Sequence, residues 1–431
     1  MPSEDHPLRY ALVNELHARP FPVLAEPCLA AFVAIITPED GVSRDKSADL
    51  AHLLSLLDRY GSAHPQPDAT HFSGTIGRSE LKWESHTEFV TCSAFTPGVT
   101  ARPFDPTEMQ VFPEDWLAQA PGKRVASVLI RIEPDAGDAD ILAKLDDWFV
   151  AESLAVARVV DGSAVIASDF RIDPGGHMRF AVFIRPTAGG RRLGRIVQRL
   201  CEIETYRAMS MLGLMRAREL TGRLNDLDPR LSALVSGLNA DDRPAEQALH
   251  ELLTIASELE SLAVQVSFRF GATQAYEAIV TQRIAALREE RVSGRQTFGE
   301  FMMRRYDPAM RTVKSTDARL HSMAERAQRA AELLRTRVDV ERSGQNQKLL
   351  ESMDRRADLA LRLQHTVEGL SVVAISYYAV SLAGYVAAPV VEAMGVAKPV
   401  AMALLVPVVV GTVWWMVRRI RRGMERRATA P

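Results

Sequence analysis

The sequence predicts an α+β cytosolic domain, then a long α-helical region with coiled-coil character, then a C-terminal transmembrane hairpin of two helices. Three observations lead to this prediction. Apolar or alternating segments separated by turn residues fill residues 1–188, helical periodicity fills residues 189–366, and two uncharged apolar runs lie within residues 367–431. We take these three ranges as the predicted domains, the last of them ending in a basic cytosolic tail.

Two apolar runs near the C-terminus predict the membrane spans. Leu370–Val391 and Pro399–Val417 contain no Asp, Glu, Lys, Arg or His, and a bilayer core about 30 Å thick needs roughly 20 apolar residues of helix. The short connection between the runs leaves no room for a domain. The alternative is a buried helical pair in a soluble protein, which the basic residues flanking both runs disfavour.

The distribution of basic residues predicts the orientation of the spans. Arg355 and Arg356 precede the first run, and the Arg418–Arg422 cluster follows the second, so the positive-inside rule places both flanks in the cytoplasm. Trp414 and Trp415 lie beside the cluster, where an aromatic anchor at the membrane interface is expected. The first twenty residues have no apolar signal-peptide core. We therefore expect two spans with the N- and C-termini cytoplasmic.

Composition excludes some function classes. The chain of 431 residues is 47% hydrophobic and 25% charged with a net charge of −2, which is ordinary for a globular protein and gives no overall field that attracts nucleic acid. Cys28, Cys92 and Cys201 are widely spaced and form no metal-binding pattern. This cysteine usage agrees with a reducing compartment.

A polar cluster lies close to the N-terminus. Asn14, Glu15, His17 and Arg19 are grouped just before Pro20. A carboxylate, an imidazole and a guanidinium at this spacing are able to bind an anion or relay a proton. An ion pair that fixes the start of the domain is the structural alternative, and we favour it because no nucleophile or metal pattern accompanies the cluster.

The same segment carries a resemblance to a known family. N-E-L-H-A-R-P, followed by the apolar run CLAAFVAII from Cys28, resembles an uncharacterised family of bacterial membrane-anchored proteins. In that family the N-E-x-H-A-R-P segment is a hallmark and the chain ends in two spans. The resemblance covers the whole chain. It implies a location in the bacterial inner (plasma) membrane and implies no activity or cofactor.

The first predicted domain contains a mixed, mostly antiparallel sheet with flanking helices. A buried strand is predicted at 28–37, a helix at 46–60 that Gly61 ends, antiparallel hairpins within 71–98, a strand at 123–132, a helix at 139–150 and short strands at 154–160, 164–172 and 177–184.

Three further segments of this domain are candidate sites. His64, His71 and His86 have spacings that match no metal-ligand pattern. Ser79–Lys82 is formally S-x-x-K, but it lies in a predicted strand where the two side chains do not converge. Gly189–Arg195 follows a strand and opens a helix, so its N–H groups are candidates to hold a phosphate. We favour an elbow between domains, because the segment matches neither nucleotide-binding glycine motif.

The helical region shows apolar residues at alternating steps of four and three, which is the coiled-coil signature. The first stripe lies in a helix expected to begin near Asp241–Pro244, and comprises Leu252, Ala256, Leu259, Ala263, Val266, Phe270 and Thr273. A second run opens at Pro308 and carries Leu320, Met323, Ala327, Ala330 and Leu334, then Leu350, Met353, Ala357 and Ala360. No helix breaker separates Ala360 from the first span, so we expect one helix to enter the membrane directly.

The order of domains also resembles the CorA-type magnesium channels, in which five chains form a funnel. Gln345–Gln347 and Ala383-Gly384-Tyr385 are loosely similar to that family. The resemblance implies oligomerisation and makes Tyr385 a candidate position at the outer mouth of a pore. The Gly-Met-Asn filter of that family should follow the Tyr, but Val386-Ala387-Ala388 stands in its place, which puts magnesium transport in doubt.

The sequence thus predicts a membrane-anchored homo-oligomer that faces the cytosol and acts as a scaffold or regulator. The alternative is a divergent CorA-like ion channel or transporter without the filter. A third hypothesis is an enzyme that uses the polar N-terminal cluster or the Gly189 loop. We expect no catalytic, cofactor-binding or metal-binding residues, a lipid bilayer as partner and no nucleic acid, and leave open whether a small molecule or ion binds.

Overall fold

A computed structural model of the chain describes residues 5–10, 12–13, 21–37, 44–237, 244–395 and 397–428, with side chains up to residue 420. The chain divides into two compact units, Met1–Glu332 and Leu333–Pro431. The longest helix, α8 (Asp307–Ala393), contributes residues to both.

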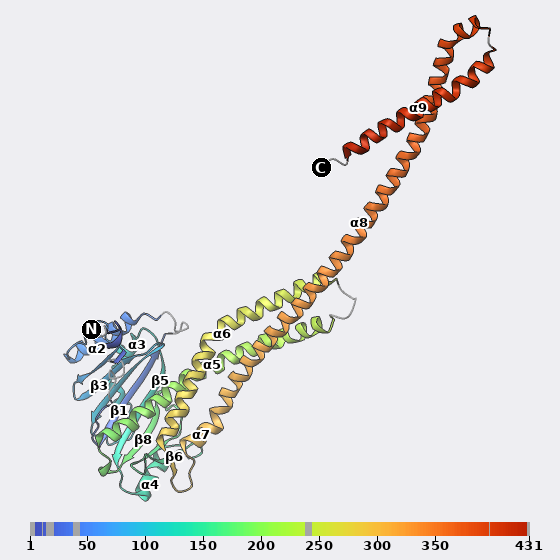
Figure 1. Cartoon of the computed structure of the whole chain (residues 1–431). Helices are drawn as coiled ribbons and strands as arrows, with labels where there is room; N and C mark the ends of the chain where they lie inside the picture. Colours follow the sequence, from blue (N-terminus) through green and yellow to red (C-terminus); the bar gives the residue numbers. More distant parts are fainter. Residues whose placement is uncertain are drawn as a thin grey trace. The chain divides into compact units, whose positions relative to one another are not determined.

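The first unit contains one nine-stranded sheet in the order β2-β3-β4-β1-β5-β8-β7-β6-β9 (Figure 1). The strands are β1 (Cys28–Ile36), β2 (His71–Ile76), β3 (Ser79–Ser85), β4 (Phe89–Pro97), β5 (Lys123–Pro134), β6 (Ala155–Val159), β7 (Ala164–Ser168), β8 (Met178–Ile184) and β9 (Glu290–Arg291). Neighbouring strands are antiparallel except for β5 and β8, which pair in parallel. The predicted mixed, mostly antiparallel sheet is confirmed.

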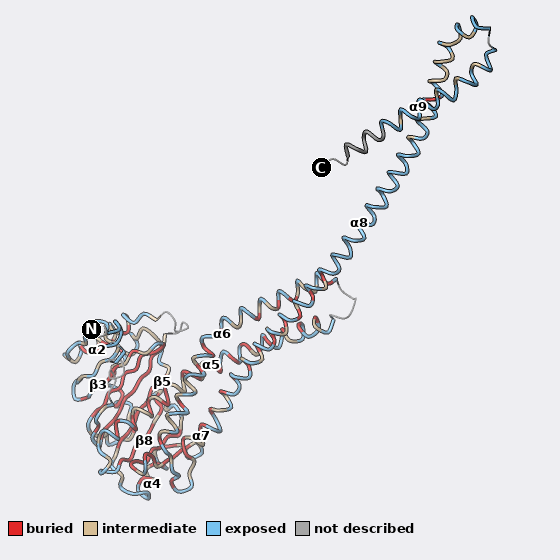
Figure 2. The backbone as a smooth tube through the Cα atoms, in the orientation of Figure 1, coloured by how far each residue is buried: buried red, intermediate tan, exposed pale blue. Residues whose placement is uncertain are grey.

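One face of this sheet packs on short helices. These are α2 (Lys46–Tyr60), the 3-10 helix η1 (Pro106–Val111), α3 (Glu114–Ala118) and α4 (Asp138–Trp148). Alternate strand residues such as Leu81 and Trp83 meet Leu53 of α2 and Trp116 of α3 in one apolar core. Figure 2 shows the buried residues concentrated in the sheet. Every second residue of a strand faces the same side of the sheet, so the alternate apolar residues form the face that packs on these helices.

The other face of the sheet is covered by α5 (Gly190–Ser236), which follows the 3-10 helix η2 (Pro186–Ala188) and contacts β1 and β5. The remaining long helices of this unit are α6 (Ala245–Leu287), α7 (Phe298–Arg305) and the first part of α8. Helices α5, α6 and this part of α8 lie side by side (Figure 1). Arg319 of α8 donates to Asn225 and Asp228 of α5 at 2.8 and 3.0 Å.

Most of the first predicted apolar stripe, and the first part of the second, pack inside the chain. In α6, Leu252, Leu259, Val266, Phe270 and Thr273 are buried. The first part of the second run, Leu320, Met323, Ala327 and Ala330, is buried in the same unit. The long helical region is confirmed, and the coiled coil remains a prediction.

The segment Asn225–Pro229 ends in a proline, which predicts a break in the helical region, but this prediction is wrong. Helix α5 continues through Pro229 to Ser236. Leu227 and Leu231, on either side of the proline, are buried, and their packing outweighs the lost backbone hydrogen bond. Ser343-Gly344 predicts an interruption or a bend in the next long helix. The dipeptide lies inside continuous α8, so the helix is not interrupted there. The predicted helix start at 241–243 falls outside the described residues.

The second unit consists of the rest of α8 and of α9 (Lys398–Ala428). Both helices carry a segment long and apolar enough to cross a membrane, and few residues of these segments are buried. Small residues of α8 face α9: Ala379, Ala383 and Gly384 are half-buried, and a Cβ on Gly384 would lie 3.3 Å from the Met402 sulfur. The two C-terminal apolar helices are confirmed.

Candidate functional site

A cavity of about 310 Å³ lies in the first unit, between the sheet and the helix α5. Strands β1, β3 and β4 form one wall, α5 forms the other, and one arginine comes from α6. Its lining is Phe21, Pro22, Phe32, Lys82, Glu84, His86, Phe89, Thr91, Ser93, Phe95, Gln198, Cys201, Glu202, Thr205, Tyr206 and Arg283. We refer to this cavity as the cleft.

A continuous row of polar contacts crosses the cleft wall. Lys82 Nζ lies 3.3 Å from Glu84 Oε1 and donates to Gln198 Oε1 at 3.1 Å. Gln198 in turn donates to Glu202 at 2.8 Å, and Arg283 Nε donates to the other oxygen of Glu202. The row joins two cations and two carboxylates from three different elements. Its charges cancel, which limits the free energy that burying them costs.

Strand alternation explains why charged residues occur at this place. In β3 the sequence SELKWES places Leu81 and Trp83 in the apolar core and Lys82 and Glu84 on the opposite face. Ser93 and Thr91 of β4 are their cross-strand partners. The side chains of Lys82 and Glu84 are only 9% and 13% exposed, so both are held in the protein interior.

Aromatic rings form the end of the cleft at the turn between β3 and β4. The His86 ring lies 4.5 Å from that of Phe89, and Phe89 packs edge-on against Tyr206 with the ring centres 5.8 Å apart. Tyr276 of α6 completes this group at 5.4 Å from Tyr206. Such offset and edge-on contacts are the preferred geometries of aromatic pairs.

An ion pair fastens this turn to α6. Arg269 Nη2 lies 2.7 Å from Glu88 Oε2, with the two side chains 6% and 2% exposed. The Tyr276 hydroxyl donates to Glu88 at 2.6 Å. Burial, and then the hydrogen bond to Glu88, raises the pKa of Tyr276 well above its usual value. The Tyr276 phenol is therefore a hydrogen-bond donor here and not an acid.

Phe21 and Pro22 line the opposite end of the cleft. The segment Phe21–Leu24 explains two of the three glycines of Gly189–Arg195, Gly190 and Gly194. A Cβ on Gly190 would lie 2.4 Å from the Leu24 carbonyl oxygen, and a Cβ on Gly194 would lie 1.8 Å from that of Pro22. Leu24 N–H also donates to the Gly190 carbonyl at 3.2 Å. The extended backbone thus crosses the first turns of α5 at a distance that only glycine permits.

The polar N-terminal cluster stays a prediction. Asn14, Glu15, His17 and Arg19 lie outside the described residues.

The three candidate histidines are in separate surroundings. His64 Nε2 lies 2.7 Å from Asp58, His71 is exposed at the start of β2, and His86 lines the cleft. Across the described ranges, no three His, Cys, Asp or Glu side chains are grouped as metal ligands would be.

The S-x-x-K pair does not converge. Ser79 Oγ shares a hydrogen bond with Thr96 at 2.7 Å, whereas Lys82 points into the cleft. Cys201 also lines the cleft, and burial raises the pKa of its thiol far above the usual value. A thiol that stays protonated is a poor nucleophile.

A buried serine within β5 and a buried histidine just before β8 meet away from the cleft. Ser127 Oγ lies 2.8 Å from His177 Nδ1. Asp173 accepts from the backbone N–H of His177 and not from its ring. Burial lowers the pKa of His177 below its usual value of 6.5. The arrangement lacks the carboxylate that orients the ring in a catalytic triad.

Tyr385, the candidate position at a pore mouth, is 83% exposed on α8. It borders a recess between α8 and α9 of about 510 Å³, together with Ser381, Gly384, Met402 and Lys398. The role of Tyr385 stays a prediction.

Sequence reasoning overlooked the cleft itself. Its signal was present in β3, where Lys82 and Glu84 alternate with Leu81 and Trp83, but a solvent-facing strand shows the same alternation. The face of β3 that carries Lys82 and Glu84 becomes a cavity wall because α5, which comes later in the chain, covers it. The local sequence of β3 does not contain that information.

The family comparison covers nearly the whole chain. The model of the family described as "Protein of unknown function (DUF3422)" matches residues 4–424. No curated protein matches the chain. The predicted membership of an uncharacterised family is confirmed: the chain belongs to the family described as "Protein of unknown function (DUF3422)".

Proposed function

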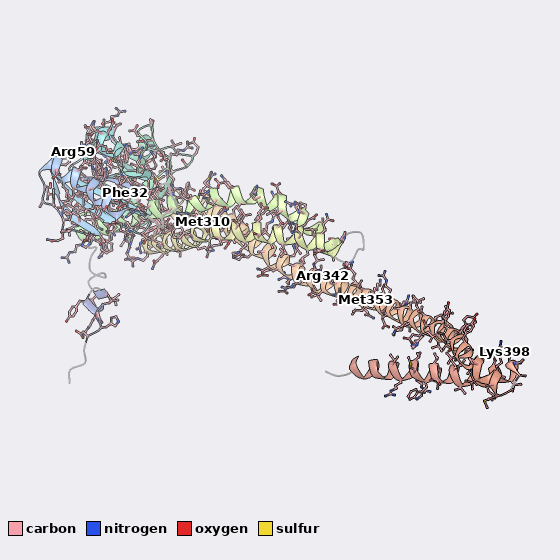
Figure 3. All side chains as sticks on the ribbon, turned by 90° about the horizontal axis from the view of Figure 1, so that it is seen from above. Phe32, Arg59, Met310, Arg342, Met353 and Lys398 are labelled. Carbon is pink, nitrogen blue, oxygen red and sulfur yellow. The ribbon has the colours of Figure 1, made fainter. Side chains whose placement is uncertain are left out.

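We propose that this protein is a membrane-anchored homo-oligomer that acts without catalysis, as a scaffold or regulator, on the cytosolic face of the bacterial inner membrane. The observation that carries the proposal is an exposed apolar stripe on α8 directly before the first apolar segment. Leu350 and Met353 are 65% and 59% exposed, and Figure 3 labels Met353 on this helix. Ala357 and Ala360 are exposed at the following positions of the same three-and-four spacing.

The two parts of the apolar stripe on α8 differ in burial, and this difference supports oligomerisation. Residues Leu320 to Ala330 of the same helix carry apolar side chains that are buried against this chain, whereas Leu350 to Ala360 are exposed to solvent. Apolar residues kept at heptad spacing on an exposed helix are typical of a seam that a second helix covers. A second copy of α8 offers the same stripe and fits that role through symmetry.

Membrane anchorage rests on the two apolar helices. Their side chains are mostly exposed, as expected where lipid is the solvent. The Arg418 guanidinium lies 4.8 Å from the Trp414 ring centre, and Arg419 lies 5.3 Å from that of Trp415. Cationic and aromatic side chains paired in this way favour the membrane interface. The proposal makes α8 and α9 a transmembrane hairpin with both chain ends in the cytoplasm.

Extraction and labelling test the anchorage and the topology. The full chain is expected to stay in the membrane pellet at alkaline pH and to be released by detergent. A single cysteine at Gly395, in a chain whose own three buried cysteines are replaced by Ala or Ser, is expected to react with a membrane-impermeant maleimide in intact cells. Release by alkali, or labelling only after cell lysis, would contradict the anchorage or the orientation respectively.

A divergent CorA-like channel is the second candidate. The uninterrupted α8 and the exposed Tyr385 near its membrane end favour it. Neither apolar run contains Asp, Glu, Lys, Arg or His, which is unusual for a coupled transporter and is compatible with a passive pore. Flux of Mg²⁺, Co²⁺, Ni²⁺ or Zn²⁺ into proteoliposomes tests it. Flux that Tyr385→Ala changes supports the channel, and no flux across a wide voltage range rejects it.

A further inference from the structure

The cleft contains more buried charge than packing of the fold requires. The row from Glu84 to Arg283 joins β3, α5 and α6 through four charged side chains. Lys82 and Glu84 are 9% and 13% exposed, and Glu202 and Arg283 are 22% and 34% exposed. Buried ion pairs contribute little to stability when apolar residues could replace them. Here the groups also border a cavity instead of filling it. A cavity with a few convergent polar groups is typical of a small-molecule site.

We propose that the cleft binds a small zwitterion of amino-acid size. The two cations and two carboxylates of the row cancel, so a ligand without net charge keeps the balance, whereas an acid or an amine alone leaves one buried charge in excess. This inference goes beyond the proposed membrane role, because every residue that it uses belongs to the first unit.

The arrangement of the row assigns an orientation to the ligand. A lysine ammonium has three N–H donors, and the contacts of Lys82 with Glu84 and Gln198 account for two. The third donor, with the guanidinium of Arg283, suits the ligand carboxylate. Glu84 lies at the aromatic end of the cleft, near His86 and Phe89, where carboxylate and ring faces together suit an ammonium group.

The apolar part of the cleft assigns the ligand's side group. Three phenylalanines line this part of the cleft. Phe21 lies next to Pro22 in the chain, Phe32 belongs to β1 and Phe95 belongs to β4. A volume of about 310 Å³ is at the lower end for ligand pockets and suits one ring or a branched aliphatic group. We therefore expect L-phenylalanine and L-leucine to bind more tightly than glycine.

Titration calorimetry on the full chain in detergent tests the proposal with named probes. These are L-phenylalanine, L-leucine and glycine, then phenethylamine and 3-phenylpropionate, each of which lacks one charge of phenylalanine. Phenylalanine or leucine is expected to bind saturably and more tightly than glycine, with the two single-charge probes about tenfold weaker than phenylalanine or more. If none of the amino acids binds, or if 3-phenylpropionate binds as tightly as phenylalanine, the proposal is wrong.

A matched pair of variants on β3 places the binding in the cleft. Glu84→Gln is expected to weaken binding about tenfold or more. Glu80→Gln makes the same change two alternations earlier on the same face, at an exposed position outside the cleft, and is expected to bind as the parent does. Equal losses in both variants, or no loss in Glu84→Gln, contradict the proposal.

A third variant keeps the test decisive if Glu84→Gln does not fold. Ser93→Leu adds apolar volume to the cleft wall beside Lys82 and is expected to abolish binding while far-UV circular dichroism stays unchanged. Retained amino-acid binding in a folded Ser93→Leu protein would show that the ligand lies elsewhere.

Discussion

At the scale of residues, Gly194 shows how one missing side chain joins two distant segments. Its Cα lies so close to the Pro22 carbonyl that an added Cβ would stand 1.8 Å from that oxygen. Pro22 follows the N-E-L-H-A-R-P segment in sequence and lines the cleft. Because Gly194 has no side chain, the backbone of Pro22 is able to lie against α5 at one end of the cleft.

Gly194→Ala is expected to destabilise the first unit by about 1–3 kcal/mol, because the backbone of Pro22 has to move away. Gly222 lies on the same helix, and an added Cβ there would meet nothing within 4 Å, so Gly222→Ala is the matched control. It is expected to stabilise the helix by about 0.5–1 kcal/mol. Thermal unfolding of both variants in detergent measures the difference, and equal melting temperatures would contradict the close approach.

His177 predicts a pH dependence of stability. Burial lowers the pKa of His177 below 6.5, so the folded state favours the neutral ring. The stability that this group contributes is present above pH 6.5 and is lost as the pH falls through the lower folded pKa. From about pH 8 to about pH 5, the melting temperature of the parent is expected to fall more steeply than that of His177→Gln. Parallel curves for the two proteins would remove His177 as the cause.

At the scale of elements, the turn between β3 and β4 is fastened to α6 by a buried charge. Glu88 pairs with Arg269 and accepts a hydrogen bond from the Tyr276 hydroxyl. Because β3 and β4 form one wall of the cleft and α6 supplies Arg283, this contact holds the two sides together. We expect it to contribute to the shape of the cleft as well as to stability.

Replacing one partner of this ion pair is expected to lower the free energy of unfolding more than replacing both partners. Glu88→Leu leaves the Arg269 guanidinium buried without its carboxylate, which costs about 3–5 kcal/mol. Combining it with Arg269→Met is expected to restore part of that loss, since no buried charge remains. Unfolding midpoints of the two single variants and the double variant measure the coupling, and additive losses would argue against a direct pair.

Most helices and strands could be predicted from the periodicity of apolar residues, whereas the pairing of strands far apart in sequence could not. The alternation in β3 and the apolar run in β1 identified strands directly, and Gly61 ended α2 in the left-handed conformation, as expected. The parallel pairing of β5 with β8 and the pairing of β9 with β6 join segments far apart in sequence. No local pattern contains such pairings, and for the same reason the cleft between β3 and α5 was not foreseen.

At the scale of the whole molecule, the small residues of α8 and its exposed apolar stripe differ in whether this chain supplies a packing partner. The small residues of α8 are already occupied against α9, with Gly384 beside Met402. These small residues therefore do not support contacts between copies. The stripe at Leu350 and Met353 has no such partner among the described residues, since both side chains are more than half exposed, so the proposed oligomer depends on it.

Charges placed in this stripe are expected to separate the copies. Leu350→Glu with Met353→Glu puts two carboxylates on the proposed seam and is expected to reduce the assembly to monomers in mild detergent. Gln347→Glu with Ser352→Glu adds the same charge at neighbouring positions off the stripe, and is expected to leave the mass unchanged. An assembly that survives the first pair, or is lost in both, would place the contact elsewhere.

The mass of the full chain in mild detergent tests the central claim most directly. Native mass spectrometry or light scattering is expected to give an integral multiple of 47.6 kDa, the mass of one chain, after the detergent is subtracted. A mass of one chain at every protein concentration tested would contradict the proposed membrane-anchored oligomer.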